Sequence, residues 1–138
     1  MKKILLDTNV LIDWLNSGRH ESVMTDPGYA RFLSAVVVME LRAGANTRAS
    51  RDAVNAITRA YGTSGRLFPP STDAFDRAGS VLRKLKLAGR NVRDSAFCND
   101  VLIAMSARTM GATVITANLR DFTAIHQVEP FNFEPPWE

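Results

Sequence analysis

The stretch Ile4-Leu5-Leu6-Asp7-Thr8-Asn9 near the amino terminus decides the fold class. Its three consecutive apolar residues predict a short strand buried on both faces, as strands of parallel sheets are. Asp, Thr and Asn are residue types that cap helix amino termini, so a helix is expected to start directly after this strand. Apolar residues then recur at helical spacing, at Val10, Leu11, Trp14 and Leu15. The stretch therefore predicts a strand-to-helix junction.

Short apolar runs alternate with helical patterns along the rest of the chain. Further strands are predicted at residues 32–36, 67–68, 113–116 and, as a short edge strand, 131–133. Helices are predicted around residues 38–43, 49–61 and 73–88, and Asn99 or Asp100 is expected to open another that ends at Gly111. Polar residues with glycine and proline predict an irregular connection over residues 16–29. This order predicts a single α/β domain over residues 1–138, a three-layer α/β/α arrangement with a mostly parallel sheet of four to five strands.

The composition is that of an ordinary globular domain. Hydrophobic residues make up 46% of the 138 residues and charged residues 22%, which argues against disorder. No apolar run approaches the roughly 18 residues that a membrane span needs, so no membrane association is expected. The first six residues resemble the start of a signal peptide, but Asp7 interrupts the run and no cleavage site follows. A cytoplasmic location is therefore expected.

Cysteine and histidine are too scarce for several kinds of site. Cys98 is the single cysteine, which excludes an internal disulfide, and with only His20 and His126 the chain lacks the ligands of a dedicated zinc site. The formal net charge is +3, and most of the 17 basic residues are arginines, which suit bidentate contacts with phosphate. This charge is compatible with nucleic-acid binding and does not by itself establish it.

Four acidic residues are expected near one edge of the predicted sheet. Asp7 directly follows the first strand, Glu40 lies in the first turn of the helix after the second, and Asp121 follows the fourth. Sites of open α/β folds form at the carboxyl ends of the strands. Asp100 joins the other three if its helix starts at the same edge.

Each acid also has a structural interpretation. Asp7 and Asp100 can cap helices, and Asp121 can be a surface residue beside an arginine. Glu40 is harder to explain, because it lies among apolar residues, and Arg42, two positions further on, does not face it on a helix.

Four acids at one edge would repel one another, and a divalent cation removes that repulsion. Ligation by oxygen alone suits Mg²⁺ or Mn²⁺. Magnesium keeps several waters, one of which can attack a phosphodiester, and Glu40 or Asp121 can orient that water. Nearby polar residues are candidates for holding the carboxylates by hydrogen bonds, with turn and capping chemistry as the alternative: Thr8, Asn9, Thr116 and Asn118.

The segments that carry these acids resemble the four motifs of the PIN domain family, in particular its VapC-type toxins from bacterial toxin–antitoxin pairs. The segments occur in the family's order and span essentially the whole chain. They are Asp7-Thr8-Asn9-Val10-Leu11-Ile12-Asp13, Val38-Met39-Glu40-Leu41-Arg42-Ala43-Gly44, Asn99-Asp100-Val101-Leu102-Ile103-Ala104 and Thr116-Ala117-Asn118-Leu119-Arg120-Asp121-Phe122.

The resemblance implies a PIN-like three-layer fold and an endoribonuclease that depends on Mg²⁺ or Mn²⁺. It also implies a homodimer and a cognate VapB-like antitoxin whose tail lies across the catalytic groove. Asp7, Glu40 and Asp100 match the family's invariant acids, and the fourth position stays open between Asp121 and Asn118. Arg42, inside the second motif, is the strongest individual candidate for contact with the RNA.

Other functions remain as alternatives. One is a PIN-fold RNA-processing nuclease outside a toxin pair, against which the small size of the chain favours the toxin. Another is a non-catalytic binding module of the same fold, which would be expected to have lost one or more of the four acids. A third is a phosphoryl-transfer enzyme with an aspartyl nucleophile, which typically needs a second aspartate two residues later, where this chain has Asn9.

Overall fold

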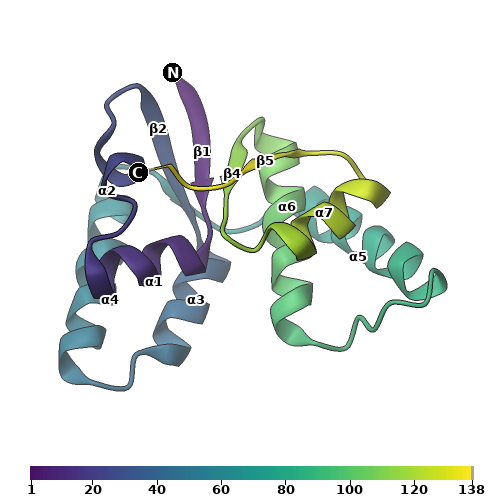
Figure 1. The fold of residues 1–138 in the computed structure, drawn as a ribbon, viewed down its shortest axis with the longest axis horizontal. Helices are drawn as coiled ribbons and strands as arrows, with labels where there is room; N and C mark the ends of the chain where they lie inside the picture. The colour runs from purple at the N-terminus through teal and green to yellow at the C-terminus, as the bar shows by residue number, and fades with distance from the viewer. Residues whose placement is uncertain (138) are drawn as a thin grey trace.

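The computed structural model describes residues 1–137 and contains a five-stranded sheet in which every pairing is parallel. The strand order is β3-β2-β1-β4-β5, and Figure 1 labels β2, β1, β4 and β5. The strands are β1 (Lys2–Leu6), β2 (Tyr29–Ser34), β3 (Leu67–Phe68), β4 (Thr113–Ile115) and β5 (Asn132–Glu134). The prediction of an α/β fold with a mostly parallel sheet is confirmed, and the predicted short edge strand near residue 132 is present as β5.

The helices form two groups that pack on the sheet. The first group is α1 (Thr8–Ser17), α2 (Glu21–Thr25), α3 (Ala35–Gly44) and α4 (Arg48–Thr63), and the second is α5 (Thr72–Leu87), α6 (Ser95–Met110) and α7 (Leu119–Val128). Figure 1 shows the first group on the left of the view and the second on the right. Contacts between helices follow this division, with α1 and α4 on α3, and α5 and α7 on α6. The result is a three-layer α/β/α arrangement, as the sequence predicts.

The strand order reverses at β1. The chain builds the sheet outward from β1 through β2 to β3, and then returns to add β4 and β5 on the other side of β1. Ligands of doubly wound α/β folds bind at the carboxyl ends of the strands where the order reverses. That point lies here between β1 and β4, whose last paired residues are Leu6 and Ile115.

The hydrophobic core includes the apolar runs that were predicted to form the central strands. Ile4, Leu5 and Leu6 are fully buried, as are Val114 and Ile115 on the neighbouring strand. Such continuous burial is typical of central strands with helices on both faces. Within residues 1–137, no helix has the length and hydropathy needed to span a membrane.

Helix caps explain two wrong boundaries. The strand predicted at 32–36 spans Tyr29–Ser34, and it ends at Ser34 because the Ser34 hydroxyl accepts a hydrogen bond from Val36 N at 3.1 Å and starts α3. The helix expected to open at Asn99 or Asp100 starts at Ser95 instead, because Asp94 accepts a hydrogen bond from the backbone N–H two residues on at 3.0 Å. Glu40 and Asp100 therefore lie beyond the first turns of their helices.

Two elements were not predicted: α7, since no helix was predicted between the fourth strand and residues 131–133, and the short helix α2. Residues 16–29 were expected to form an irregular connection, and they include the short helix α2. Val23 is its fully buried residue and joins the hydrophobic core. Burial of this single apolar side chain gives too short a pattern to identify a helix from sequence.

Candidate active site

Asp7 lies at the carboxyl end of β1 and is the most firmly held of the four acids. Its backbone N–H donates to the carbonyl of Ile115 at 3.0 Å, which fixes it beside β4. Its Oδ1 accepts from Thr8 N at 2.8 Å, so the residue also caps α1. The side chain is buried, with 2% of the residue exposed. The capping role and the position at the edge of the sheet therefore coexist.

Two polar side chains hold the second carboxylate oxygen of Asp7. The buried Thr116 hydroxyl, just after β4, donates to Oδ2 at 2.7 Å, and Asn9 Nδ2 donates to the same oxygen at 3.0 Å. Asn9 Oδ1 accepts from the backbone of Ala117 at 3.0 Å, which joins α1 to the loop after β4. These hydrogen bonds hold the Asp7 carboxylate against the loop after β4.

Glu40 links three helices. It lies on α3, its Oε1 accepts from the Thr8 hydroxyl of α1 at 2.7 Å, and its Oε2 accepts from Asn99 Nδ2 of α6 at 3.3 Å. This explains how a glutamate among apolar residues is tolerated, because both oxygens have hydrogen-bond donors. Asn99 was predicted only as a cap, and no pattern in the sequence pairs it with Glu40.

Asp100 lies on the second turn of α6, and only 8% of the residue is exposed. Its Oδ2 accepts from Asn118 Nδ2 at 3.1 Å. The same amide donates to Asp121 Oδ2, also at 3.1 Å, so Asn118 connects the two acids. Asn118 and Asp121 therefore lie together in this region, and which of them fills the fourth position stays a prediction.

Electrostatics show that the acids are near enough to influence one another. Burial raises the pKa of Asp7 above its ordinary value of 3.8, and the charge of Glu40 acts in the same direction. Burial also raises the pKa of Asp100, to about 8, with further contributions from the charges of Asp7, Glu40 and Asp121. A cluster in which one carboxyl retains its proton near neutral pH is electrostatically suited to a cation.

The donor set fits a hydrated hard cation better than a fully protein-bound one. Among residues 1–137, no group of three or more Asp, Glu, His or Cys side chains is arranged to hold a metal ion. Mg²⁺ needs fewer ligands from the protein, since it commonly binds through one or two carboxylates and keeps several waters. Asp7 and Asp100 are the two buried carboxylates at this edge, and oxygen ligands of this kind suit Mg²⁺ or Mn²⁺.

Arg42 lies on the last turn of α3, and its guanidinium donates to Asn55 Oδ1 of α4 at 2.9 Å. This contact is exposed and includes none of the four acids. A role of Arg42 in RNA contact stays a prediction.

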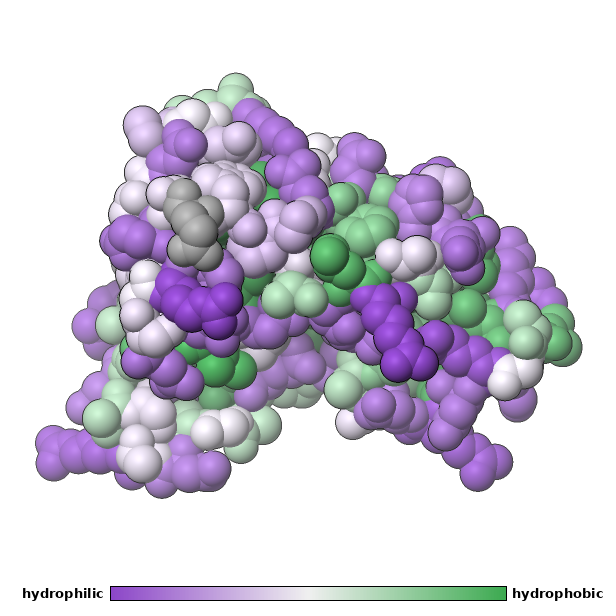
Figure 2. Space-filling view, in the orientation of Figure 1, coloured by the Kyte–Doolittle hydropathy of each residue, from purple (hydrophilic) through white to green (hydrophobic). Residues whose placement is uncertain are grey.

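Figure 2 shows that the lower edge of the molecule, toward which the strands run in Figure 1, is hollowed between the two helix groups.

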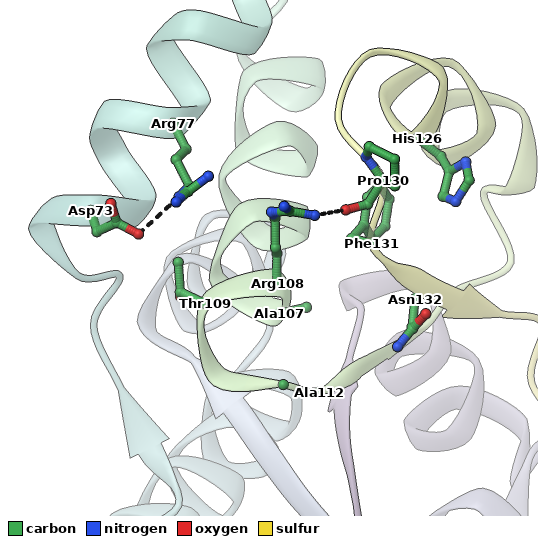
Figure 3. Close-up of a pocket in the computed structure, with 11 residues that line it drawn as sticks. Asp73, Arg77, Ala107, Arg108, Thr109, Ala112, His126, Pro130, Phe131 and Asn132 are labelled. Carbon is green, nitrogen blue, oxygen red and sulfur yellow. Dashed lines mark hydrogen bonds and ion pairs between the residues drawn. The ribbon is translucent and has the colours of Figure 1, made fainter.

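A separate pocket of about 630 Å³ lies at the opposite edge of the sheet (Figure 3). Ala112 and Asn132, next to the amino ends of β4 and β5, line it together with charged residues of α5 and α6. Its arginines already have partners, since Arg77 pairs with Asp73 at 3.0 Å and Arg108 lies 3.5 Å from Glu129. None of the four acids is among the residues that line this pocket.

Comparison with protein families assigns the class. The model of the PIN domain matches residues 4–126, so the chain belongs to the PIN domain family. A search of curated proteins finds no sequence match.

Solved structures with the same fold cover nearly the whole chain. DNA-bound VapBC from Salmonella typhimurium has a TM-score of 0.74 at 24% identity, covering 99% of this chain and 100% of that chain. VapBC2 from Rickettsia felis, bound to a DNA fragment from the promoter, has a TM-score of 0.73 at 19% identity with 99% of both chains covered. VapBC-5 from Mycobacterium tuberculosis, a member of the VapBC family of toxin-antitoxin systems, has a TM-score of 0.63 at 24% identity with 98% of both chains covered.

Proposed function

We propose that this chain is the toxin of a VapBC-type toxin–antitoxin pair and acts as an endoribonuclease that depends on Mg²⁺ or Mn²⁺. The observation that carries the proposal is the buried pair Asp7 and Asp100 at the point where the strand order reverses. Burial raises the pKa values of both groups, and the charges of the neighbouring acids raise them further. Membership of the PIN domain family and the VapBC structures of similar fold support the same function.

Asp7 and Asp100 would hold the metal ion, and Glu40 lies beside them. A bound Mg²⁺ or Mn²⁺ supplies a Lewis acid that polarises the phosphate and makes a water more acidic. Thr116 and Asn9 keep the Asp7 carboxylate in one orientation through the hydrogen bonds to its Oδ2. Fixing the carboxylate in advance lowers the cost of binding the ion and the substrate.

Glu40 is suited to accept the proton of the attacking water. Each of its oxygens accepts one hydrogen bond, from Thr8 and from Asn99, and so keeps a further lone pair. In the proposed reaction the water oxygen bonds to phosphorus, a P–O bond of the RNA backbone breaks, and the leaving oxygen takes up a proton. No histidine or cysteine is required.

An antitoxin is the partner that the proposal names. A groove of about 370 Å³ lies between α1, α3 and α4, and Glu40 is one of its lining residues. Its other lining residues include Ile12, Leu15 and Val54, which make it largely apolar. An amphipathic segment of a VapB-like antitoxin that filled this groove would end beside the acids and block them.

A homodimer remains a prediction. Light scattering on the purified protein measures its oligomeric state and tests this prediction.

The decisive experiment incubates the purified protein with RNA in the presence of Mg²⁺, Mn²⁺ or EDTA. We expect cleavage with either ion, none in EDTA, and loss of cleavage in a folded Asp7→Asn variant. Asp52→Asn, an exposed acid on α4, is the matched control and should cleave as the wild type does. Full activity of the folded Asp7→Asn protein would contradict the mechanism.

The RNA target requires a second measurement. Sequencing of the 5′ ends of cellular RNA after brief expression, with Asp7→Asn as the comparison, identifies the RNA class and the cleavage site. New 5′ ends that appear equally with both proteins would contradict the proposed activity.

A further inference from the structure

Asp121 has both carboxylate oxygens occupied by protein donors. Arg90 Nη2 donates to Oδ1 at 2.6 Å, and Asn118 Nδ2 donates to Oδ2 at 3.1 Å. The Arg90 contact is a charge-assisted hydrogen bond of short length, which is the strong kind. A metal ion that used Asp121 would have to compete with this guanidinium.

Arg90 is itself held on two sides. Its guanidinium carbon lies 4.2 Å from the centroid of the Phe97 ring, and Phe97 is a buried residue of α6. This is a cation–π contact. The Arg90 backbone N–H donates to the carbonyl of Leu85 at 3.0 Å, which ties the loop after α5 to that helix. With its backbone fixed and its side chain held by Asp121 and Phe97, Arg90 loses little further conformational freedom on binding a ligand.

The guanidinium keeps donors for a ligand. An arginine side chain has five N–H donors, and within residues 1–137 its hydrogen bond to Asp121 is the one recorded for the Arg90 side chain. The Arg90 side chain is 33% exposed. Asn118 connects Asp121 to Asp100, so this guanidinium lies close to the edge of the sheet that carries Asp7 and Asp100, which we call the metal edge. A planar fork of donors beside that edge matches the shape and charge of a phosphate.

We propose that Arg90 binds a backbone phosphate of the RNA beside the metal edge, and that Asp121 orients Arg90 instead of binding the metal. This inference rests on the proposed nuclease function and assigns a role within the same site. Arg90 is then a substrate-binding residue and Asp121 a positioning residue. Asn118, which donates to Asp100 and Asp121 together, couples the phosphate-binding and metal-binding parts of the site.

Two measurements distinguish this assignment from two others, in which Asp121 binds the metal or Arg90 obstructs the metal site. Both are binding measurements and do not depend on catalysis. RNA affinity is measured by fluorescence anisotropy, without divalent ions and over a series of salt concentrations, with a labelled single-stranded RNA oligonucleotide. Mn²⁺ affinity is measured without RNA, by the loss of the electron paramagnetic resonance signal of the free ion. The variants are Arg90→Gln, Arg90→Lys, Asp121→Asn and the Arg90→Gln/Asp121→Asn double variant. Arg93→Gln, an exposed arginine of the same loop, is the matched control.

We expect Arg90→Gln to weaken RNA binding about tenfold, as loss of a hydrogen bond to a charged group does. The slope of log affinity against log salt should fall by about 0.7, the value for one phosphate contact to a single strand. Asp121→Asn should also weaken RNA binding, although removal of an acid near RNA would otherwise strengthen it. The double variant should bind RNA no more weakly than Arg90→Gln, because both changes remove one interaction. Arg90→Lys should keep the salt slope with intermediate affinity, and Arg93→Gln should behave as the wild type in this loop-specific comparison.

Mn²⁺ binding provides the test of the Asp121 assignment. We expect Asp121→Asn and Arg90→Gln to leave Mn²⁺ affinity unchanged, while Asp100→Asn weakens it. Weaker Mn²⁺ binding by Asp121→Asn would identify Asp121 as a metal ligand and overturn the inference. Tighter Mn²⁺ binding by Arg90→Gln would show that Arg90 hinders metal binding in the wild type, which would also overturn the inference.

Failure of the inference is distinguishable from failure of the proposed function. If the wild-type protein cleaves RNA with Mg²⁺ but Arg90→Gln and Arg90→Lys bind RNA with wild-type affinity and salt slope, only the inference is overturned. If the wild-type protein binds neither RNA nor Mn²⁺, the proposed function and the inference both fail. Circular dichroism of each variant establishes that it is folded, and Arg90→Lys carries the test if Arg90→Gln does not fold.

Discussion

At the scale of single residues, the site depends on a carboxyl group that the fold places at an electrostatic cost. Asp100 is buried near three other acids, and its pKa is raised to about 8. The sequence alone permitted Asp100 to be only a helix cap. Its burial on the second turn of α6 is what makes it a candidate metal-binding residue.

This raised pKa predicts how the stability of the metal-free protein changes with pH. Between about pH 4, near the ordinary Asp pKa, and about pH 8, the folded state holds a proton on Asp100 that the unfolded chain has released. Stability falls with rising pH wherever the folded state binds more protons, so the free energy of unfolding should decrease across this window and level off above it. The slope from this group cannot exceed about 1.4 kcal/mol per pH unit.

Urea unfolding in EDTA across this pH range measures the effect. Asp100→Asn should remove most of the decrease, because the variant carries no proton to lose. Mg²⁺ should restore stability of the wild type near pH 8 and have less effect near pH 5, where a protonated Asp100 binds metal poorly. Equal pH slopes for wild type and Asp100→Asn would contradict the assignment of the raised pKa to this residue.

At the scale of elements, strand positions were predicted well and helix starts less well. Ile4–Leu6 and Val114 lie in central strands that are buried on both faces, and continuous apolar runs reveal such strands directly. The start of α6 was placed too late, because Asn99 and Asp100 are capping residue types and were expected to open the helix. Apolar Phe97, one helical turn before Val101, was the available signal that the helix starts earlier.

The contacts among the site residues were the part that sequence could not predict. The order of strands and helices predicted a shared edge for Asp7, Glu40 and Asp121, and for Asp100 only if its helix started at that edge. The partners of two of them were not predicted, because Asn99 and Arg90 meet Glu40 and Asp121 only through packing of separate helices and loops. No periodicity or local spacing encodes contacts between residues so distant in the chain.

The cap of α6 gives a prediction for this element. Asp94 accepts a hydrogen bond from Ala96 N at 3.0 Å and is exposed, so its replacement affects little besides the helix start. Asp94→Ala should lower the free energy of unfolding by about 1 kcal/mol, the usual cost of losing such a cap. Asp94→Asn keeps a capping side chain and should be close to wild type. Urea unfolding compares the three, and a loss of stability equal in both variants would indicate that the charge of Asp94 matters instead of the cap.

At the scale of the whole molecule, the site and the apolar groove share a residue. Glu40 belongs to the acid cluster and also lines the groove between α1, α3 and α4. An antitoxin bound in the groove, as proposed, would control access to the acids without binding the metal itself. Affinity for the partner would then come from apolar contacts, separate from the chemistry at the edge of the sheet.

The groove predicts which surface changes weaken antitoxin binding while sparing activity. Ala53 lines the groove on α4, whereas Ala56 on the same helix is exposed and does not line it. Ala53→Arg should fill the groove and weaken binding of the cognate antitoxin at least about tenfold, a loss typical of a disrupted interface core. Ala56→Arg adds the same charge outside the groove and should leave the affinity near that of wild type. Calorimetric titration with the antitoxin and RNA cleavage by the free toxin are the two readouts. If both variants lose affinity equally, the added charge is responsible and not the groove. If both keep wild-type affinity, the antitoxin binds another surface.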